Sequence, residues 1–200
     1  MGEAGTTRIG LFGGTFDPVH TAHLEVADAV RRALSLDRML VVVANEPWQK
    51  EGERAVTGAE DRWAMVQAAV TEWPGLEASR MEIDRGGPSY TIDTVRQLGK
   101  EEPGADIVLV VGSDVVGGLT SWHEEQALRP LVTLAVVGRP GSPPVEAPPG
   151  WRSVTVPVAP FEVSSTELRD RLESGRTVRG LVPDPVIRCI EQRGLYATRR

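Results

Sequence analysis

The chain has 200 residues, of which 40% are hydrophobic and 25% are charged, and its formal net charge is −6 at pH 7. This length is sufficient for one well-buried core and short for two. The acidic balance gives no general basic surface, so we expect no nucleic-acid partner and only local anion-binding sites. The single cysteine, Cys189, excludes an internal disulfide framework.

Hydrophobic runs in the sequence are short. None approaches the roughly 18 apolar residues of a membrane-spanning helix, and the first eight residues lack the apolar core of a signal peptide. We therefore expect a cytoplasmic chain with no membrane partner. The sequence does not fix the oligomeric state, and a homo-oligomer is compatible with it.

Taken in chain order, apolar runs alternate with helical patterns from a first strand that begins at residue 8. Continuous apolar runs at 40–44 and 107–111 are typical of strands covered on both faces. Such alternation predicts an α/β fold with a single Rossmann-like, doubly wound parallel sheet. Strands are expected at 8–13, 40–44, 78–84, 107–111 and 131–137, and helices at 22–35, from 57 or 58 to about 72, and at 91–98.

The segment 139–150, RPGSPPVEAPPG, contains five prolines and two glycines, which predicts a long surface loop. The residues after it are expected to form one strand and two short helices, too few to bury a core alone. We therefore predict one domain over residues 1–200. It is divided into a Rossmann-like core at 1–158 and a small C-terminal helical subdomain at 159–200.

The segment 13–23, GGTFDPVHTAH, joins the first expected strand to the first expected helix, a position where α/β proteins bind phosphates. Gly13 and Gly14 carry no Cβ that would keep backbone N–H groups away from a phosphate, and the positive end of the helix favours an anion. His20 and His23 are three residues apart, so both imidazoles share one face of the first turn. Two of the three histidines lie here, which favours a functional turn.

Other motifs of this kind fit less well. A Walker A loop ends in Lys-Ser or Lys-Thr and a dinucleotide fingerprint has three spaced glycines, and neither is present. A zinc-hydrolase helix has histidines at i and i+4 around a glutamate, whereas Thr21 and Ala22 separate these two. A transition-metal site made by Asp17, His20 and His23 stays an alternative, and a single histidine is more often a packing residue.

GGTFDPVHTAH resembles the signature of the nucleotidyltransferase superfamily that carries an H-x-G-H motif. The segments 45–50 (NEPWQK), 84–94 (DRGGPSYTIDT) and 163–169 (VSSTELR) resemble, in order and spacing, the bacterial nicotinate-nucleotide adenylyltransferase family. The resemblance covers nearly the whole chain. One departure is Ala22, which stands where the family has glycine and adds a methyl group near the expected phosphate path.

The resemblance implies a role in NAD biosynthesis. The 5′-phosphate of nicotinate mononucleotide would attack the α-phosphorus of ATP in line, giving nicotinate adenine dinucleotide and pyrophosphate. This nucleophile is already ionised, so no covalent intermediate is needed, and the protein aligns two anions and neutralises charge. The histidines are expected to act as hydrogen-bond donors rather than general bases. The expected catalytic residues, which with Mg²⁺ as cofactor supply positive charge, are His20, His23, Lys50 and Arg169, and no protein ligand to a metal is assigned.

A second group of residues follows the proline-rich loop. Ser164 and Glu167 have the spacing of a capping box, so the minimal interpretation is a capped helix. The resemblance adds a second phosphate cradle, in which Ser165 and Thr166 offer hydroxyls and Arg169 binds phosphate oxygens in a fork. Asp114 is expected to orient a ribose hydroxyl, and Arg139 to flank the adenine or the phosphates. The expected ATP contacts are Gly13, Gly14, Thr15, Phe16, His20, His23, Gly112, Asp114, Arg139, Ser164, Ser165, Thr166 and Arg169.

A third group suits a flat ring that bears a carboxylate. Tyr90 and Thr91 at one expected helix start, and 121–123 at another, offer backbone N–H donors beside an indole. The resemblance implies that Trp122 stacks on the pyridine ring and that amides near Thr91 and His123 bind the carboxylate, although Trp122 alone is equally typical of a core. The expected mononucleotide contacts are Thr15, Asn45, Lys50, Thr91, Trp122 and His123.

Two kinds of alternative stay open. One is a sister adenylyltransferase acting on phosphopantetheine, which the segment 86–91 and Trp122 disfavour, or on nicotinamide mononucleotide, which differs from nicotinate mononucleotide by one amide. The other is a nucleotide-binding regulatory module without turnover, for which Ala22 leaves room.

Overall fold

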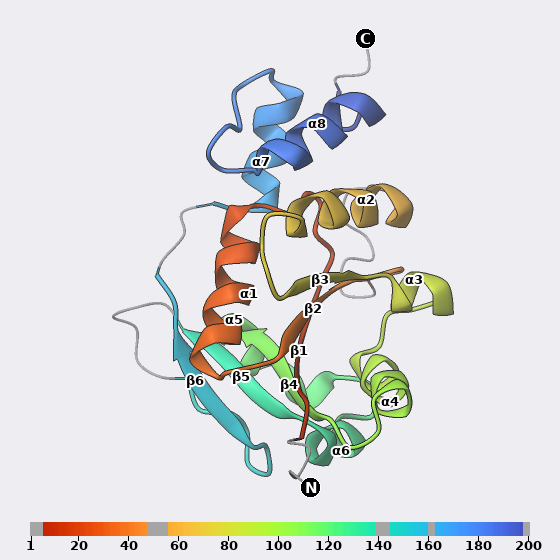
Figure 1. Cartoon of the computed structure of the whole chain (residues 1–200), viewed down its shortest axis with the longest axis vertical. Coiled ribbons are helices and arrows are strands. Elements are labelled where there is room, and N and C mark those ends of the chain that lie inside the picture. The colour runs from red at the N-terminus through yellow and green to blue at the C-terminus, as the bar shows by residue number, and fades with distance from the viewer. Residues whose placement is uncertain (1–5, 48–55, 139–144, 160–162, 198–200) are drawn as a thin grey trace, which may run out of the picture.

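The computed structural model describes residues 6–47, 56–138, 145–159 and 163–197. Its centre is a six-stranded sheet in the order β3-β2-β1-β4-β5-β6, in which every neighbouring pair is parallel (Figure 1). This doubly wound sheet confirms the predicted fold class. The strands are β1 Arg8–Gly14, β2 Arg38–Val43, β3 Leu76–Ser79, β4 Asp106–Gly112, β5 Thr133–Gly138 and β6 Ser153–Pro157.

The strand order reverses beside β1. Its register runs from Ile9 opposite Arg38 to Gly14 opposite Val43 on β2, while β4 pairs with its other edge. After β3 the chain crosses over to β4 and continues outward in the opposite direction. The carboxyl ends of β1 and β4 therefore form the switch point, where open α/β sheets bind ligands.

Helices cover both faces of the sheet. Alternate residues of β2 divide between two buried apolar clusters, with Val41 and Val43 in the first and Leu40 and Val42 in the second. The first cluster includes residues of α1 Thr21–Ala33, α2 Ala59–Val70, α7 Ser165–Glu173 and α8 Asp184–Arg193. The second face carries α3 Met81–Arg85, α4 Thr91–Glu101, α5 Ser113–Val116, η2 Leu119–Ser121, α6 Glu125–Leu128 and η3 Arg129–Leu131.

The C-terminal helices α7 and α8 lie at the end of the molecule where α1 begins, beside α2 (Figure 1). Leu168 of α7 and Ile190 of α8 are buried in the same apolar cluster as Val19 and Met65. The buried faces of these helices thus join the core beneath the sheet. The division of the domain at residue 158 stays a prediction.

One predicted element is wrong. Residues 78–84 are not a strand: β3 ends at Ser79, and Met81–Arg85 form the short helix α3. A strand would send Met81 and Glu82 to opposite faces, whereas the helix buries both of these consecutive side chains. Of the predicted proline-rich loop, residues 145–150 are irregular and 139–144 lie outside the described residues.

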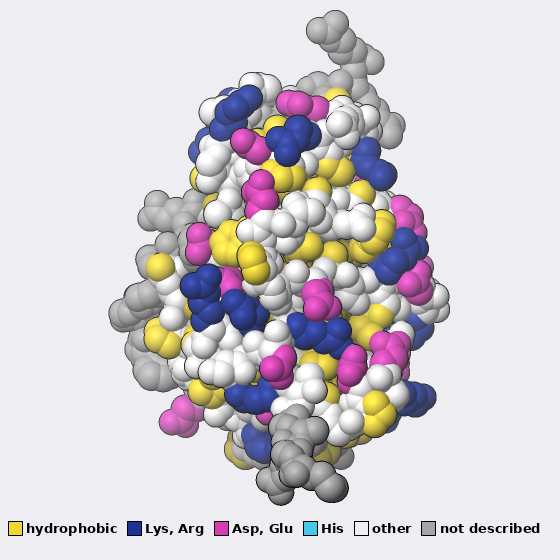
Figure 2. Space-filling model, in the orientation of Figure 1, with side chains coloured by type: hydrophobic (Ala, Val, Ile, Leu, Met, Phe, Trp, Pro, Cys, Tyr) yellow, Lys and Arg dark blue, Asp and Glu magenta, His cyan; other side chains and the backbone are white. Residues whose placement is uncertain are grey.

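None of the described helices has the length and apolar character needed to cross a membrane. On the face seen in Figure 2, acidic and basic side chains are interspersed rather than gathered by sign.

Candidate active site

A cavity of about 500 Å³ opens at the switch point of the sheet. Residues 11–15 of β1 and the turn after it form one wall, and residues 109–112 of β4 form the floor beside them. The opposite wall carries Tyr90, Thr91 and Trp122, which are remote in sequence. The fold therefore brings the first and third predicted groups of residues to one cavity.

The two glycines at the end of β1 differ in their surroundings. A Cβ on Gly14 would lie 2.7 Å from the ring of Phe16, which is 3% exposed and packs there. A Cβ on Gly13 would meet no described atom within 4 Å, so its bare backbone faces open space in the cavity wall. Gly13 fits the predicted approach of a phosphate to the backbone. Phe16 supports this wall from behind and does not line the cavity.

The two histidines of the turn lie together, as their spacing predicts. His20 is the N-cap residue of α1 and His23 lies in its first turn. Their rings stack with centroids 3.6 Å apart and planes 24° apart. His23 lines the cavity, packs edge-on against Phe16, and accepts a hydrogen bond at Nδ1 from the His20 N–H at 3.3 Å.

His20 is buried behind His23, with 5% of its surface exposed. Burial lowers its pKa from 6.5 to about 4, so the ring is neutral at pH 7 in the unliganded protein. The expectation that His20 supplies positive charge concerns the complex with phosphates, and it stays a prediction. Its Nδ1 is buried and has no hydrogen-bond partner among the described residues.

We call residues 15–20, which connect β1 to α1, the histidine turn. Arg62 of α2 holds this turn in place. This guanidinium is 1% exposed and donates to the carbonyl oxygens of Thr15 at 2.9 Å, Ala44 at 2.6 Å, Asn45 at 3.0 Å and Thr57 at 2.7 Å. One side chain thus joins the turn, the end of β2 and the segment before α2.

Sequence reasoning missed Arg62, although a signal was present. It precedes Met65 and Val66 by three and four residues, so a charged side chain falls on the buried face of the helix. Burial lowers the pKa of Arg62, and the charge of Asp17 opposes that effect.

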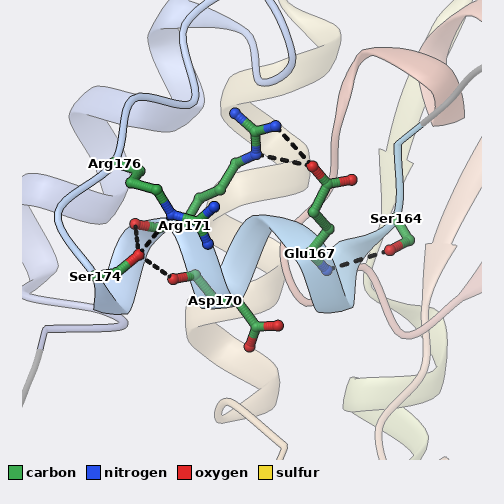
Figure 3. Close-up of polar contacts among 6 residues, drawn as sticks. All are labelled: Ser164, Glu167, Asp170, Arg171, Ser174 and Arg176. Carbon is green, nitrogen blue, oxygen red and sulfur yellow. Dashed lines mark hydrogen bonds and ion pairs between the residues drawn. The ribbon is translucent and has the colours of Figure 1, made fainter.

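The predicted second cradle begins at Ser164, whose hydroxyl accepts a hydrogen bond from the Glu167 N–H at 3.2 Å and caps α7 (Figure 3). The Glu167 carboxylate does not complete a capping box. It pairs with Arg171 one turn along α7, at 2.7 Å. Arg171 is therefore engaged along α7, which leaves Arg169 as the arginine that faces the turn.

The start of α7 is bonded directly to the histidine turn. Ser165 donates its hydroxyl to the Pro18 carbonyl at 3.0 Å, and Arg169 donates to the Asp17 carbonyl at 2.7 Å and to the Thr166 hydroxyl at 3.1 Å. The starts of α1 and α7 are thus adjacent, as the two-cradle prediction requires. Ser164, Ser165, Thr166, Arg169 and His20 lie outside the lining of the cavity itself.

The opposite end of the cavity is aromatic. Tyr90 is the N-cap residue of α4 and Thr91 its first residue, which confirms that predicted helix start. The rings of Tyr90 and His123 stack with centroids 4.3 Å apart, and Trp122 lines the wall beside them. A flat ring fits this aromatic surface.

The second helix start predicted there is wrong. Residues 121–123 connect η2, which ends at Ser121, to α6, which begins at Glu125. Glu124 between them has a left-handed backbone with φ of 48°, so the helix cannot extend back through it. The Trp122 N–H already donates to the Leu119 carbonyl at 3.0 Å and is not available as a carboxylate donor.

The other predicted contacts divide into three groups. Thr15, Gly112 and Asp114 line the cavity. Asn45 does not line it, because its side-chain amide donates to the Gly87 carbonyl at 2.9 Å and supports the loop before Tyr90. Lys50 and Arg139 lie outside the described residues.

Glu82 is a cavity residue that sequence reasoning missed. It is 7% exposed, lines the cavity, and accepts a hydrogen bond from the Thr94 hydroxyl at 2.5 Å, which in turn accepts one from Arg85 at 3.0 Å. Interpreting 78–84 as a strand concealed it. Ala22, in contrast, is 7% exposed and lies outside the lining.

The alternative of a transition-metal site at the histidine turn finds no support in the described residues. No group of three or more His, Cys, Asp or Glu side chains placed to hold a metal occurs among them. The Asp17 carboxylate is bonded to the Tyr196 hydroxyl at 2.6 Å and to the Thr57 N–H at 3.3 Å.

Comparisons with known proteins agree with this geometry. Residues 11–171 match the cytidylyltransferase-like family. The chain is 44% identical to a "probable nicotinate-nucleotide adenylyltransferase" of Methylibium petroleiphilum, covering 100% of this chain and 97% of that one. A protein of the same name from Thermus thermophilus is also 44% identical, over 94% and 99% of the two chains. The chain belongs to the nicotinate-nucleotide adenylyltransferase family.

A solved structure shares the fold. The nicotinic acid mononucleotide adenylyltransferase of Plasmodium falciparum, solved with NaAD, has a TM-score of 0.77 and covers 95% of this chain and 97% of its own. At 17% sequence identity this likeness concerns the fold alone. Members of the family are nucleotidyltransferases of NAD biosynthesis, which confirms the resemblance found in the sequence.

Proposed function

We propose that the cavity binds ATP and nicotinate mononucleotide side by side and that the chain transfers the adenylyl group between them. The observation that carries this assignment is the pairing of two unlike ends in one cavity. At one end, the bare backbone of Gly13 and the ring of His23 lie where β1 leads into α1. At the other end, Tyr90 and Trp122 form an aromatic wall beside Thr91 at the start of α4. The first suits phosphates and the second a ring with an acidic group.

At the phosphate end, hydrogen-bond donors neutralise the charge that develops during transfer. The polyphosphate extends from the cavity past His23 toward the start of α7, where Arg169 supplies a permanent charge. Anionic phosphate next to His20 favours its protonated form and would raise its lowered pKa. Lys50, outside the described residues, is proposed to add a further charge.

At the ring end, the acidic group of the mononucleotide is proposed to bind the free N–H groups at the start of α4, near Thr91. The amide near His123 stays part of the proposal, whereas the Trp122 N–H is bonded to the Leu119 carbonyl. Trp122 is proposed to act through its ring, which stacks on the pyridine. An amide in place of the carboxylate would point its NH₂ donor at the backbone N–H donors of the protein. Nicotinate mononucleotide is therefore expected to be preferred over nicotinamide mononucleotide.

Mg²⁺ is proposed as the cofactor, and the donor set in the cavity fits it. This ion prefers oxygen ligands and is commonly held by phosphates with one or two carboxylates. We propose that Asp114, which is exposed and lines the cavity, would share the ion with the phosphates, in addition to the ribose contact expected for it from the sequence. The ion would neutralise charge on the phosphates and the leaving pyrophosphate.

We make two further proposals, one about the location of the enzyme in the cell and one about its oligomeric state. We infer from the family that the enzyme works in the cytoplasm, where ATP and the mononucleotide are found. The second is that the enzyme forms a homo-oligomer.

The proposed function is tested by pyrophosphate release with ATP, Mg²⁺ and either nicotinate or nicotinamide mononucleotide. We expect release only when a mononucleotide is present, with the acid strongly preferred. A preference for the amide would identify the sister activity. Nucleotide binding without release would identify a regulatory module and contradict the proposal.

A further inference from the structure

The mechanism above leaves unused a buried group at the base of the histidine turn. Asp17 is 5% exposed, and three elements bond to it. Its carboxylate accepts from the Tyr196 hydroxyl at 2.6 Å and from the Thr57 N–H at 3.3 Å, while its main-chain carbonyl accepts from Arg169 at 2.7 Å. Asp17 therefore joins the turn to α7, to the segment before α2 and to the end of the chain.

Tyr196 comes from the segment that follows α8. It is 9% exposed in the apolar cluster, with its hydroxyl 2.6 Å from Asp17 and 3.8 Å from the Met65 sulfur. Its backbone is left-handed, with φ of 58°, which is uncommon for a residue with a side chain. Burial, with the Asp17 charge, raises the pKa of Tyr196 above its usual range, so the hydroxyl keeps its proton and donates.

We propose that Tyr196 is a positioning residue for adenylyl transfer, acting through Asp17 on His20 and Arg169. Tyr196 does not line the cavity and touches no expected substrate atom. Its hydroxyl holds the carboxylate of Asp17. The main-chain carbonyl of Asp17 accepts a hydrogen bond from Arg169, and Asp17 lies three residues before His20. This inference rests on the proposed function, because it concerns the geometry of that reaction.

The hydroxyl matters because the second bond to the carboxylate is weak. Among the described residues, removal of Tyr196 Oη leaves the buried Asp17 carboxylate with the 3.3 Å bond from the Thr57 N–H, and burial keeps water from replacing the lost bond. We expect the Asp17 main chain to shift as its carboxylate moves toward other partners, which would displace the carbonyl that holds Arg169. Displacements of about 1 Å in groups that align reactants can cost about a hundredfold in rate.

A purely structural role for Tyr196 is the competing explanation, and Tyr196→Phe separates the two. The change keeps the ring in the core and removes only the hydroxyl. Arg193→Ala is the matched control, because Arg193 ties α8 to α2 through Asp61 at 2.7 Å, and this ion pair does not include Asp17. It loosens the same C-terminal region without touching Asp17.

Two readouts are measured on the full chain. The first is kcat and KM for ATP and nicotinate mononucleotide. The second is the imidazole resonances of the three histidines, in which His123 at the ring end of the cavity serves as internal reference. We expect Tyr196→Phe to lower kcat about tenfold or more, to leave KM for the mononucleotide within about twofold, and to shift His20 and His23 but not His123.

A second comparison tests the route through Asp17. If the hydroxyl acts through this carboxylate, Tyr196→Phe should add little further loss to an Asp17→Asn variant. Arg193→Ala should leave both readouts unchanged.

The inference is overturned if Tyr196→Phe keeps kcat within about twofold, if its histidine resonances do not move, or if Arg193→Ala reproduces its loss. Absence of product from the unmodified chain would instead overturn the proposed function. In that case the histidine resonances alone decide whether Tyr196 holds the turn.

Discussion

At the scale of single residues, His20 shows how burial changes what a motif does. The sequence places it correctly at a helix start but cannot reveal that its ring is 5% exposed and stacked behind His23. Its pKa of about 4 is below the 6.5 of the unfolded chain, so the unfolded chain binds the proton first as pH falls. The contribution of neutral His20 to the free energy of unfolding is therefore complete above pH 6.5. It is lost as the pH falls from 6.5 to 4, by roughly 3 kcal/mol.

This loss is measured by urea unfolding between pH 7.5 and 4.5, for the unmodified chain and for His20→Gln. Other titrating groups are common to both proteins and cancel in the difference. We expect the stability of the unmodified chain to fall more steeply with acid than that of the variant. Parallel curves would show that His20 is not buried in neutral form.

At the same scale, Ala22 stands where the H-x-G-H motif has glycine, which raises the question of whether its methyl group crowds the phosphates. Its methyl group is 7% exposed and outside the cavity lining, so we expect no crowding of phosphates. Ala22→Gly should leave the KM for ATP unchanged and destabilise the fold by about 0.5–1 kcal/mol, because glycine is more flexible when unfolded. A lower KM for ATP in Ala22→Gly would restore the crowding interpretation. The measurements are steady-state kinetics and denaturant unfolding.

At the scale of elements, the sequence predicts most of the sheet and helices because their apolar patterns are regular. The pattern fails at α3, which lies between β3 and α4 and is only five residues long. The burial of Met81 and Glu82 there depends on tertiary contacts. It also fails at 121–123, because the left-handed backbone of Glu124 separates these residues from the start of α6. Such local geometry is fixed by neighbours rather than by periodicity.

Arg62 provides the prediction at this scale, because α2 holds three segments through it. Arg62→Met keeps the volume of the side chain but leaves the carbonyls of Thr15 and Ala44 buried without this donor. Each such group costs about 1–3 kcal/mol, so for the two together we expect a loss of at least about 2 kcal/mol in unfolding free energy. The control is Arg80→Met, which removes the exposed ion pairs to Glu60 and Asp84 and should change stability by about 1 kcal/mol or less.

Arg62→Met is measured by chemical denaturation, with Arg80→Met unfolded in parallel. Equal losses in the two variants would contradict the role assigned to the buried guanidinium.

At the scale of the whole molecule, the fold explains why residues remote in sequence meet. The switch point beside β1 joins the histidine turn to the aromatic wall of α4, and α7 returns the end of the chain to the same turn. Sequence motifs predicted which segments meet, whereas Arg62, Glu82 and Tyr196 were missed. These three act through buried hydrogen bonds to other segments, and such bonds leave no periodic signal in the sequence.

The central claim is that the cavity has a phosphate end and a ring end for two different substrates. Its most direct test is the KM for ATP and for nicotinate mononucleotide in Trp122→Ala. Because the ring of Trp122 is assigned to one substrate, we predict that KM rises for the mononucleotide, by about tenfold for a lost stacking contact of 1–1.5 kcal/mol, and stays within about twofold for ATP. A variant impaired mainly toward ATP would contradict this arrangement of the site.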